Sequence, residues 1–168
     1  VVLALSSQFK FSLWFSPVPI TLQVFFIFLI SMIFEQRFAV GSLLVYMALG
    51  TGSLPVFAGG AGGIAYVFGP TGGYLFGFLI ASRIIGLLQT RTDRWGNQLL
   101  AASLGLGALY LCGYGWLLVW LAGATGGISS ATVMLAWQQG VLPFVFVDFL
   151  KIAAACSIAS LLVSKKSR

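Results

Sequence analysis

The sequence lacks histidine altogether, and it has only two cysteines and three acidic residues among 168. Cys112 and Cys156 each lie in an apolar run without a Cys-x-x-Cys spacing, so neither a zinc site nor a disulfide framework is predicted. No P-loop of the form GxxxxGK[ST] occurs, so we do not expect the chain itself to hydrolyse ATP. Its composition therefore implies neither a resident cofactor nor an enzyme.

Charge of either sign is also scarce. Only 7% of the residues are charged and 60% are hydrophobic, whereas about a quarter of a soluble domain is charged. A helix that crosses a bilayer needs about 20 mostly apolar residues, so this chain has room for about six. We predict an all-α integral membrane protein, with residues 1–168 forming a single six-helix domain among lipids. The net charge of +6 then orients the helices, and no nucleic-acid partner is expected.

Six apolar blocks are separated by glycine, proline and charged residues. They cover about 1–15, 20–34, 38–54, 71–89, 99–121 and 137–163. The first block is shorter than a full span and the sequence begins at Val1, so we expect the first helix to be truncated at its N-terminus.

The basic residues outside these blocks occur in alternate connections. They are Arg37 after the second block, Arg91 and Arg94 after the fourth, and Lys165, Lys166 and Arg168 in the tail. Because Lys and Arg concentrate on the cytoplasmic side, this alternation predicts an even number of spans with both termini in the cytoplasm.

A glycine-rich stretch, GTGSLPVFAGGAGGIAYVFGPTGG at 50–73, joins the third and fourth blocks. Glycine permits close backbone approach and unusual dihedral angles, and loops of this length are usually functional or disordered. Its apolar content favours a lid or pocket wall, with Phe57, Gly59, Gly60 and Gly62 as the lid residues. The alternative is a flexible linker.

Two ionisable residues of the last block lie three positions apart, at Asp148 and Lys151. This spacing places both on one face of a helix. Charge within a membrane is costly, so such residues normally face the bundle interior and mark a solute site. The pair offers an acceptor and a donor to a urea or amide group. The alternative is an ion pair that only joins helices.

Arg83 lies in the fourth block without an acidic residue nearby in sequence, and a guanidinium is well shaped to bind a carboxylate. The alternative is that Arg83 extends its side chain to the cytoplasmic interface. Lys10, near the end of the first block, is interpreted as interfacial. Gln23 and Tyr74 are weaker candidates, since either one alternatively forms a hydrogen bond between helices.

Four motifs together resemble one known family. They are PVPITLQ at 17–23, GSLPVFAGGAGG at 52–63, FGPTGGYLFGF at 68–78 and LPFVFVDFLK at 142–151. The chain is similar to BioY, the biotin-specific S components of energy-coupling factor (ECF) transporters. The resemblance implies a biotin pocket near the outer face of a multi-pass protein of the cytoplasmic membrane, with biotin contacts from Asp148, Lys151, Arg83, Gln23 and Gly63.

As partners, the resemblance implies a coupling membrane protein and two ATPase subunits that drive biotin uptake. In our hypothesis Asp148 and Lys151 hold the ureido ring of biotin while Arg83 neutralises its carboxylate, although exchanged roles of Lys151 and Arg83 remain open. Two alternatives are an S component for another vitamin and a proton-coupled carrier of a small carboxylate. An intramembrane enzyme is disfavoured because Asp148 lacks a second acid, a nucleophile or a metal partner.

Overall fold

The computed structural model describes residues 1–89 and 95–166. In order, the elements are α1 (Val2–Gln8), β1 (Lys10–Phe11), β2 (Ile20–Thr21), α2 (Gln23–Ile33), α3 (Gln36–Thr51), α4 (Ile64–Val67), α5 (Gly72–Gln89), α6 (Trp95–Thr125), α7 (Ser130–Gly140) and α8 (Val145–Lys166). Arg91, Arg94 and Arg168, which the charge pattern assigns to the cytoplasmic side, lie outside the described residues. The helical architecture that the apolar blocks predict is confirmed.

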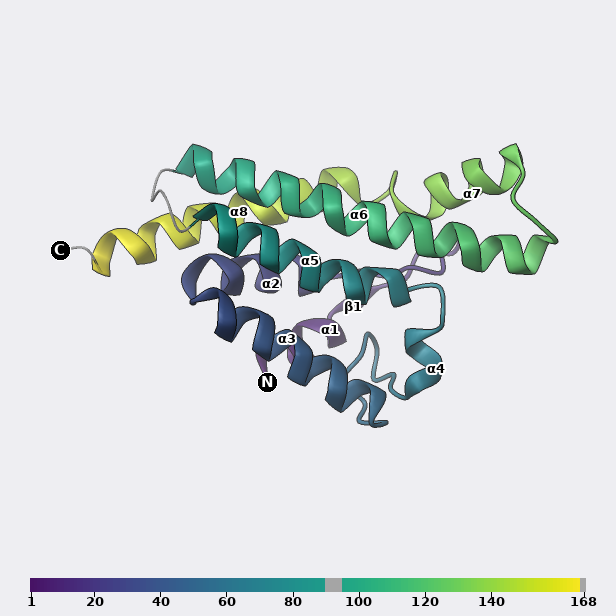
Figure 1. Ribbon diagram of the computed structural model, residues 1–168, viewed down its shortest axis with the longest axis horizontal. Coiled ribbons are helices and arrows are strands. Elements are labelled where there is room, and N and C mark those ends of the chain that lie inside the picture. The colour runs from purple at the N-terminus through teal and green to yellow at the C-terminus, as the bar shows by residue number, and fades with distance from the viewer. Residues whose placement is uncertain (90–94, 167–168) are drawn as a thin grey trace.

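The helices form an elongated bundle, in which α5 and α2 occupy the middle (Figure 1). Helix α6 runs along one side together with α7 and α8, and α1, α3 and α4 lie on the other side (Figure 1). The fully buried core includes Phe28 of α2, Ile85 of α5, Leu109 of α6 and Ile152 of α8. Apolar side chains from both halves of the sequence therefore meet in one core.

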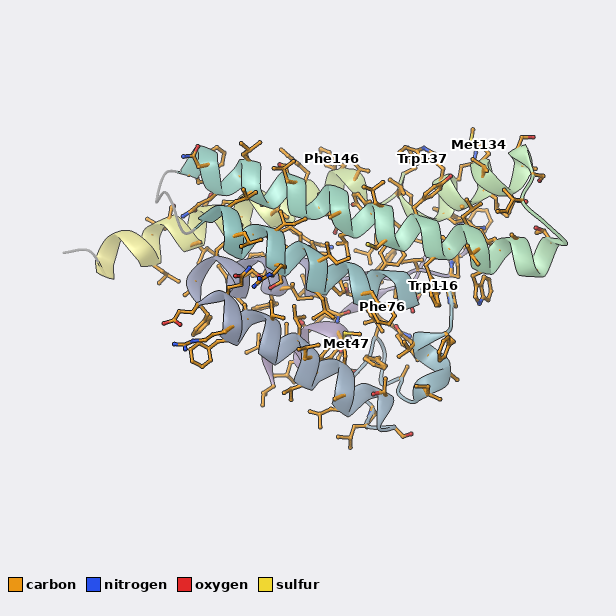
Figure 2. The ribbon with its side chains drawn as sticks, in the orientation of Figure 1. Met47, Phe76, Trp116, Met134, Trp137 and Phe146 are labelled. Atoms are coloured by element: carbon orange, nitrogen blue, oxygen red, sulfur yellow. The ribbon has the colours of Figure 1, made fainter. Side chains whose placement is uncertain are left out.

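Glycine allows α5 and α6 to pack closely. A Cβ atom at Gly73 would collide with the side chain of Trp116, and one at Gly77 would overlap Leu109. In membranes, small residues at such crossings let two helix backbones approach. Phe76 and Trp116 lie at this same contact, with ring centroids 6.4 Å apart (Figure 2).

Two helical segments are long and apolar enough to cross a membrane, judged by length and composition. They are Trp95–Thr125 and the combined segment Ser130–Leu162, with mean hydropathies of 1.6 and 2.0. Only 33% of each apolar window is buried, which distinguishes them from the core helix of a soluble protein. Phe146, Trp137 and Met134 are exposed on the outside of the bundle (Figure 2). The total of six spans stays a prediction.

The first apolar block does not form one helix over 1–15. Helix α1 ends at Gln8, and the chain continues as β1, which pairs antiparallel with β2 so that Lys10 faces Thr21. Pro17 and Pro19 lie in the connection, where their fixed φ angles and missing N–H groups oppose a continuing helix. The prediction of one helix over the whole block was wrong, because the chain leaves the helix after Gln8 to pair with β2.

The last apolar block is also divided. We predicted one helix over 137–163, but a turn at 141–144 separates α7 from α8. Pro143 lies in this turn, and proline inside a helix removes a backbone hydrogen bond and clashes with the carbonyl four residues earlier. The break matters for function because it places the carbonyl of Gly140 next to Tyr74.

Candidate functional site

A small hollow lies where β2 and the start of α2 meet α5, α6 and α8, and its volume is about 50 Å³. We call it the inner hollow. It is lined by Val18, Pro19, Ile20, Thr21, Gln23, Val24, Ala58, Tyr66, Thr71, Tyr74, Leu75, Phe78, Leu109, Tyr110, Phe144 and Asp148.

Asp148 and Lys151 form an ion pair at this hollow. Lys151 Nζ donates to Asp148 Oδ1 at 2.7 Å and to the carbonyl of Thr21 at 2.8 Å. Tyr110 Oη donates to the second carboxylate oxygen, Asp148 Oδ2, at 2.9 Å. Asp148 is only 4% exposed, so its charge is compensated by an ammonium and a phenol rather than by water. The pair thus lies at the inner hollow while it also joins α8 to β2 and α6.

Gln23 extends this polar set from the first turn of α2. Its Nε2 donates to Tyr46 Oη at 2.9 Å, and its Oε1 accepts from Thr21 Oγ1 at 3.4 Å. Gln23 is 5% exposed and lines the inner hollow. A buried amide that is held by both its nitrogen and its oxygen has a fixed orientation.

Tyr74, in the first turn of α5, also lines the inner hollow. Its hydroxyl donates to the carbonyl of Gly140 at 2.6 Å. Its ring packs onto Gly113 of α6, where a Cβ atom would collide with the aromatic carbons. Because its only donor is used by Gly140, Tyr74 offers a ligand mainly its ring and the remaining lone pairs of its oxygen.

The glycine-rich segment packs as a wall of the site, through Ala58 and Tyr66. Phe57 anchors it, since its ring is fully buried, stacks on Tyr66 at a centroid distance of 4.8 Å and meets the edge of Tyr46 at 5.5 Å. A Cβ atom at Gly50 would overlap the Phe57 ring, so this close approach requires glycine. Such packing differs from the alternative of a flexible linker.

The glycines that we predicted for the lid and for biotin contact shape the segment and do not line the inner hollow. Gly59, Gly60 and Gly63 have φ angles of 72°, 76° and 92°, which L side chains rarely adopt. The Gly63 N–H donates to the carbonyl of Gly50 at 2.7 Å, and a Cβ atom at Gly62 would overlap the Leu54 carbonyl oxygen. The structure thus gives these glycines a conformational role.

Arg83 lies apart from this site. Its side chain is exposed, and it follows Tyr74 by nine residues on α5, a distance of about 14 Å along the helix axis. Its backbone carbonyl accepts from Gln36 Nε2 at 2.7 Å, close to the turn between α2 and α3. Arg83 does not line the inner hollow, nor does it line the larger hollow of about 360 Å³ beside it. This placement fits the alternative in which its side chain reaches the membrane interface.

A second, larger hollow borders the first on its solvent side. This outer hollow has a volume of about 360 Å³ and shares Pro19, Ala58, Tyr66 and Thr71 with the inner hollow. Its other lining residues are Lys10, Ser12, Ser16, Pro17, Ala65, Gly69 and Pro70. The shared residues form a common wall, so the outer hollow lies directly beside the inner hollow that Asp148 lines.

An apolar groove of about 630 Å³ between α1, α2 and α3 is larger than either hollow. Among the described residues that line it, Arg37 alone has a charged side chain, and its Nε pairs with Glu35 Oε2 at 2.8 Å. Ligand sites combine apolar walls with a few convergent polar groups. We therefore place the candidate site at the inner hollow, where Asp148, Gln23 and Tyr110 converge, and not in the groove.

Three residues of the site were not predicted from the sequence, namely Tyr110, Thr21 and Tyr66. Tyr110 is a polar side chain in the middle of a long apolar helix, and that position is a signal that was available from the sequence. Thr21 contributes its carbonyl, which any residue type supplies equally well, so no sequence signal points to it. Tyr66 takes its place only through the path of the glycine-rich segment.

Comparison with known proteins agrees with the motifs. A family model with the description "BioY family" matches residues 1–168. The chain is 39% identical over 150 residues to "Probable biotin transporter BioY" of Pyrococcus horikoshii, which covers 89% of this chain and 83% of that protein. It is 37% identical over 143 residues to "Biotin transporter BioY" of Thermotoga maritima. This match covers 85% of this chain and 79% of that protein.

The fold is similar to a crystal structure at 2.1 Å of the S-component for biotin from an ECF-type ABC transporter. The TM-score is 0.81 at 25% sequence identity, and the match covers 97% of this chain and 85% of the other. The family that the four motifs indicate is therefore confirmed, and so is the likeness to an S-component fold.

Proposed function

Because this chain belongs to the BioY family, we propose that it is the biotin-binding membrane subunit of a vitamin uptake transporter. The observation that carries the proposal is the hydrogen-bonded set of Asp148, Lys151 and Tyr110 at the inner hollow. The names of its relatives and of the similar structure support the same ligand.

The chemistry of the inner hollow suits the ureido ring of biotin. A urea presents two N–H donors and one carbonyl acceptor. Each oxygen of a carboxylate has a second lone pair, so Asp148 accepts from the ligand while it keeps its bonds to Lys151 and Tyr110. Leu75, Phe78 and Leu109 provide an apolar surface for the rest of the bicycle. The ligand enters by widening the inner hollow, since small-molecule sites measure about 300–1,000 Å³.

We propose that the protein crosses the cytoplasmic membrane several times with both termini inside. In Figure 1, the turn between α2 and α3, the end of α5 and the end of α8 lie at the same end of the bundle. These are the connections in which Lys and Arg concentrate, and such residues mark the cytoplasmic side. In this orientation the outer hollow lies toward the outer face, as uptake requires.

An ATP-driven partner supplies the energy in this proposal. The chain has no P-loop, and the similar structure is the S-component of an ECF-type ABC transporter. We propose that a coupling membrane protein and two ATPase subunits complete the transporter. Co-purification from a membrane that expresses all four chains would test this composition.

Calorimetry on the purified protein with biotin and a panel of other vitamins tests the function. We expect biotin to bind and the others not to compete. Tight binding of a different vitamin, with no binding of biotin, would overturn the proposal in favour of another S component. Uptake that collapses with the proton gradient and needs no ATPase would favour a secondary carrier.

A further inference from the structure

The placement of Arg83 leaves the anionic end of the ligand without the basic residue that we expected to bind it. Lys151 is less suited to this role, because its charge is already compensated by Asp148 and two of its three N–H donors bind Asp148 Oδ1 and the Thr21 carbonyl. A carboxylate that enters an apolar path needs a cation or several hydrogen-bond donors.

Lys10 lies at the outer hollow. Among the described residues that line the inner and outer hollows, it is the only basic one. In the β1–β2 pair it stands opposite Thr21, whose carbonyl holds Lys151 and whose side chain lines the inner hollow. Residues directly opposite in an antiparallel pair lie on one face with Cβ atoms about 5 Å apart, so Lys10 and Thr21 start from the same side of the ribbon.

The glycine-rich segment leaves room for the Lys10 side chain. A Cβ atom at Gly59 would collide with Lys10 Nζ and Cε, so the lysine stem lies directly over that glycine. Hydrogen bonds tie the same two segments together, from Ser7 Oγ to the Val56 carbonyl at 2.6 Å and from Gln8 Nε2 to the Phe57 carbonyl at 3.2 Å. Lys10 lines the outer hollow and its side chain is exposed, so its donors are accessible to a ligand there.

We propose that Lys10 is the residue that binds the carboxylate of the transported ligand in the outer hollow, while the polar ring occupies the inner hollow. This inference rests on the proposed function. It gives the two hollows separate roles: the inner one selects the ring by hydrogen bonds, and the outer one selects the free acid by charge. Lys10 therefore distinguishes biotin from its uncharged derivatives.

The test compares biotin with biotin methyl ester on wild-type protein and on Lys10→Gln, Lys10→Arg and Arg83→Ala, using calorimetry in detergent. Lys10→Gln should weaken biotin binding by about five- to tenfold, the effect of one charge-assisted hydrogen bond at a partly exposed site, and leave the ester unchanged. Lys10→Arg should keep the preference for the free acid. Arg83→Ala, the matched loss of one exposed cation, should behave as wild type.

Two outcomes would overturn the role of Lys10. One is unchanged biotin affinity in Lys10→Gln, and the other is an equal loss for biotin and ester, which would mean that the lysine only supports the lid. A separate result, in which wild-type protein binds neither biotin nor ester, would refute the proposed function itself. Gel filtration and thermal unfolding of each variant establish that it is folded.

Discussion

The inner and outer hollows differ in how their charges are held. At the inner hollow, Asp148 is almost fully buried and both of its oxygens accept hydrogen bonds from the protein. At the outer hollow, Lys10 is exposed and lies over a glycine with a positive φ angle. The inner hollow measures about 50 Å³ and the outer one about 360 Å³.

This difference separates two kinds of recognition. Buried charges in a complete network have fixed positions, and removing one member leaves the others uncompensated. An exposed cation is hydrated and mobile, so it contributes a modest and salt-dependent attraction. We therefore expect substitutions at the inner hollow to affect both folding and binding, whereas those at the outer hollow affect binding of the free acid alone.

The largest effect is expected for Asp148→Asn. The change leaves the Lys151 ammonium buried without a counter-charge, which costs about 3–5 kcal/mol in the free energy of unfolding, and biotin binding should fall by more than about a hundredfold. Thermal unfolding and calorimetry measure the two effects. Glu35→Gln is the matched control because its carboxylate pairs with Arg37 at the surface, where about 0–1 kcal/mol is expected. Equal behaviour of the two variants would contradict a buried network.

Tyr110→Phe should have the next largest effect. It removes one hydrogen bond to the Asp148 carboxylate, worth about 1.5–3 kcal/mol for a charged acceptor. Biotin affinity should fall by at least about tenfold in calorimetry. Tyr114 lies one helical turn away on α6, and its hydroxyl is 3.5 Å from the Val133 carbonyl. Tyr114→Phe therefore serves as the control. A loss in Tyr114→Phe as large as that in Tyr110→Phe would argue against a specific role for Tyr110.

Gly113→Ala tests the packing that fixes Tyr74. The added Cβ atom would collide with the Tyr74 ring, and overpacking of this kind costs about 1–3 kcal/mol of unfolding free energy. Gly107→Ala on the same helix is the control, because no heavy atom lies within 4 Å of its added Cβ atom. Thermal unfolding should separate the two variants. Unfolding of both variants at the wild-type temperature would contradict the close packing of the Tyr74 ring on Gly113.

The smallest effect is expected for Arg83→Ala. Its side chain is exposed and lies away from both hollows, so biotin affinity and the preference for the free acid should stay within about twofold of wild type. Calorimetry with biotin and its methyl ester checks this. Loss of the free-acid preference would restore the carboxylate role that the sequence suggested for Arg83.

Much of the ion pair was predictable from the sequence. Asp148 and Lys151 lie three residues apart in an apolar helix, and helical periodicity alone places them on one face. Gln23 and Tyr74 line the hollow next to this pair, as their positions in the first turns of α2 and α5 allow. Which ligand atom each residue meets stays a prediction.

Other features were not predictable because they depend on contacts between distant segments. Pairing of Lys10 with Thr21 ends the first helix early, and the carbonyl of Thr21 becomes a ligand of Lys151 130 positions away. The sequence suggested that Arg83 faces the bundle interior, whereas its side chain lies on the surface of the bundle. A hydropathy pattern gives the depth of a residue along a helix only roughly and does not say which neighbours cover it.

The sequence by itself indicated the class of protein, because so few charges and so many apolar residues are typical of helices that cross a membrane. It also determined the family, through four motifs in a fixed order. The tertiary structure alone decided which charges share a hollow. Side-chain convergence depends on helix rotation and on the path of the glycine-rich segment, and both follow from packing between residues far apart in the chain.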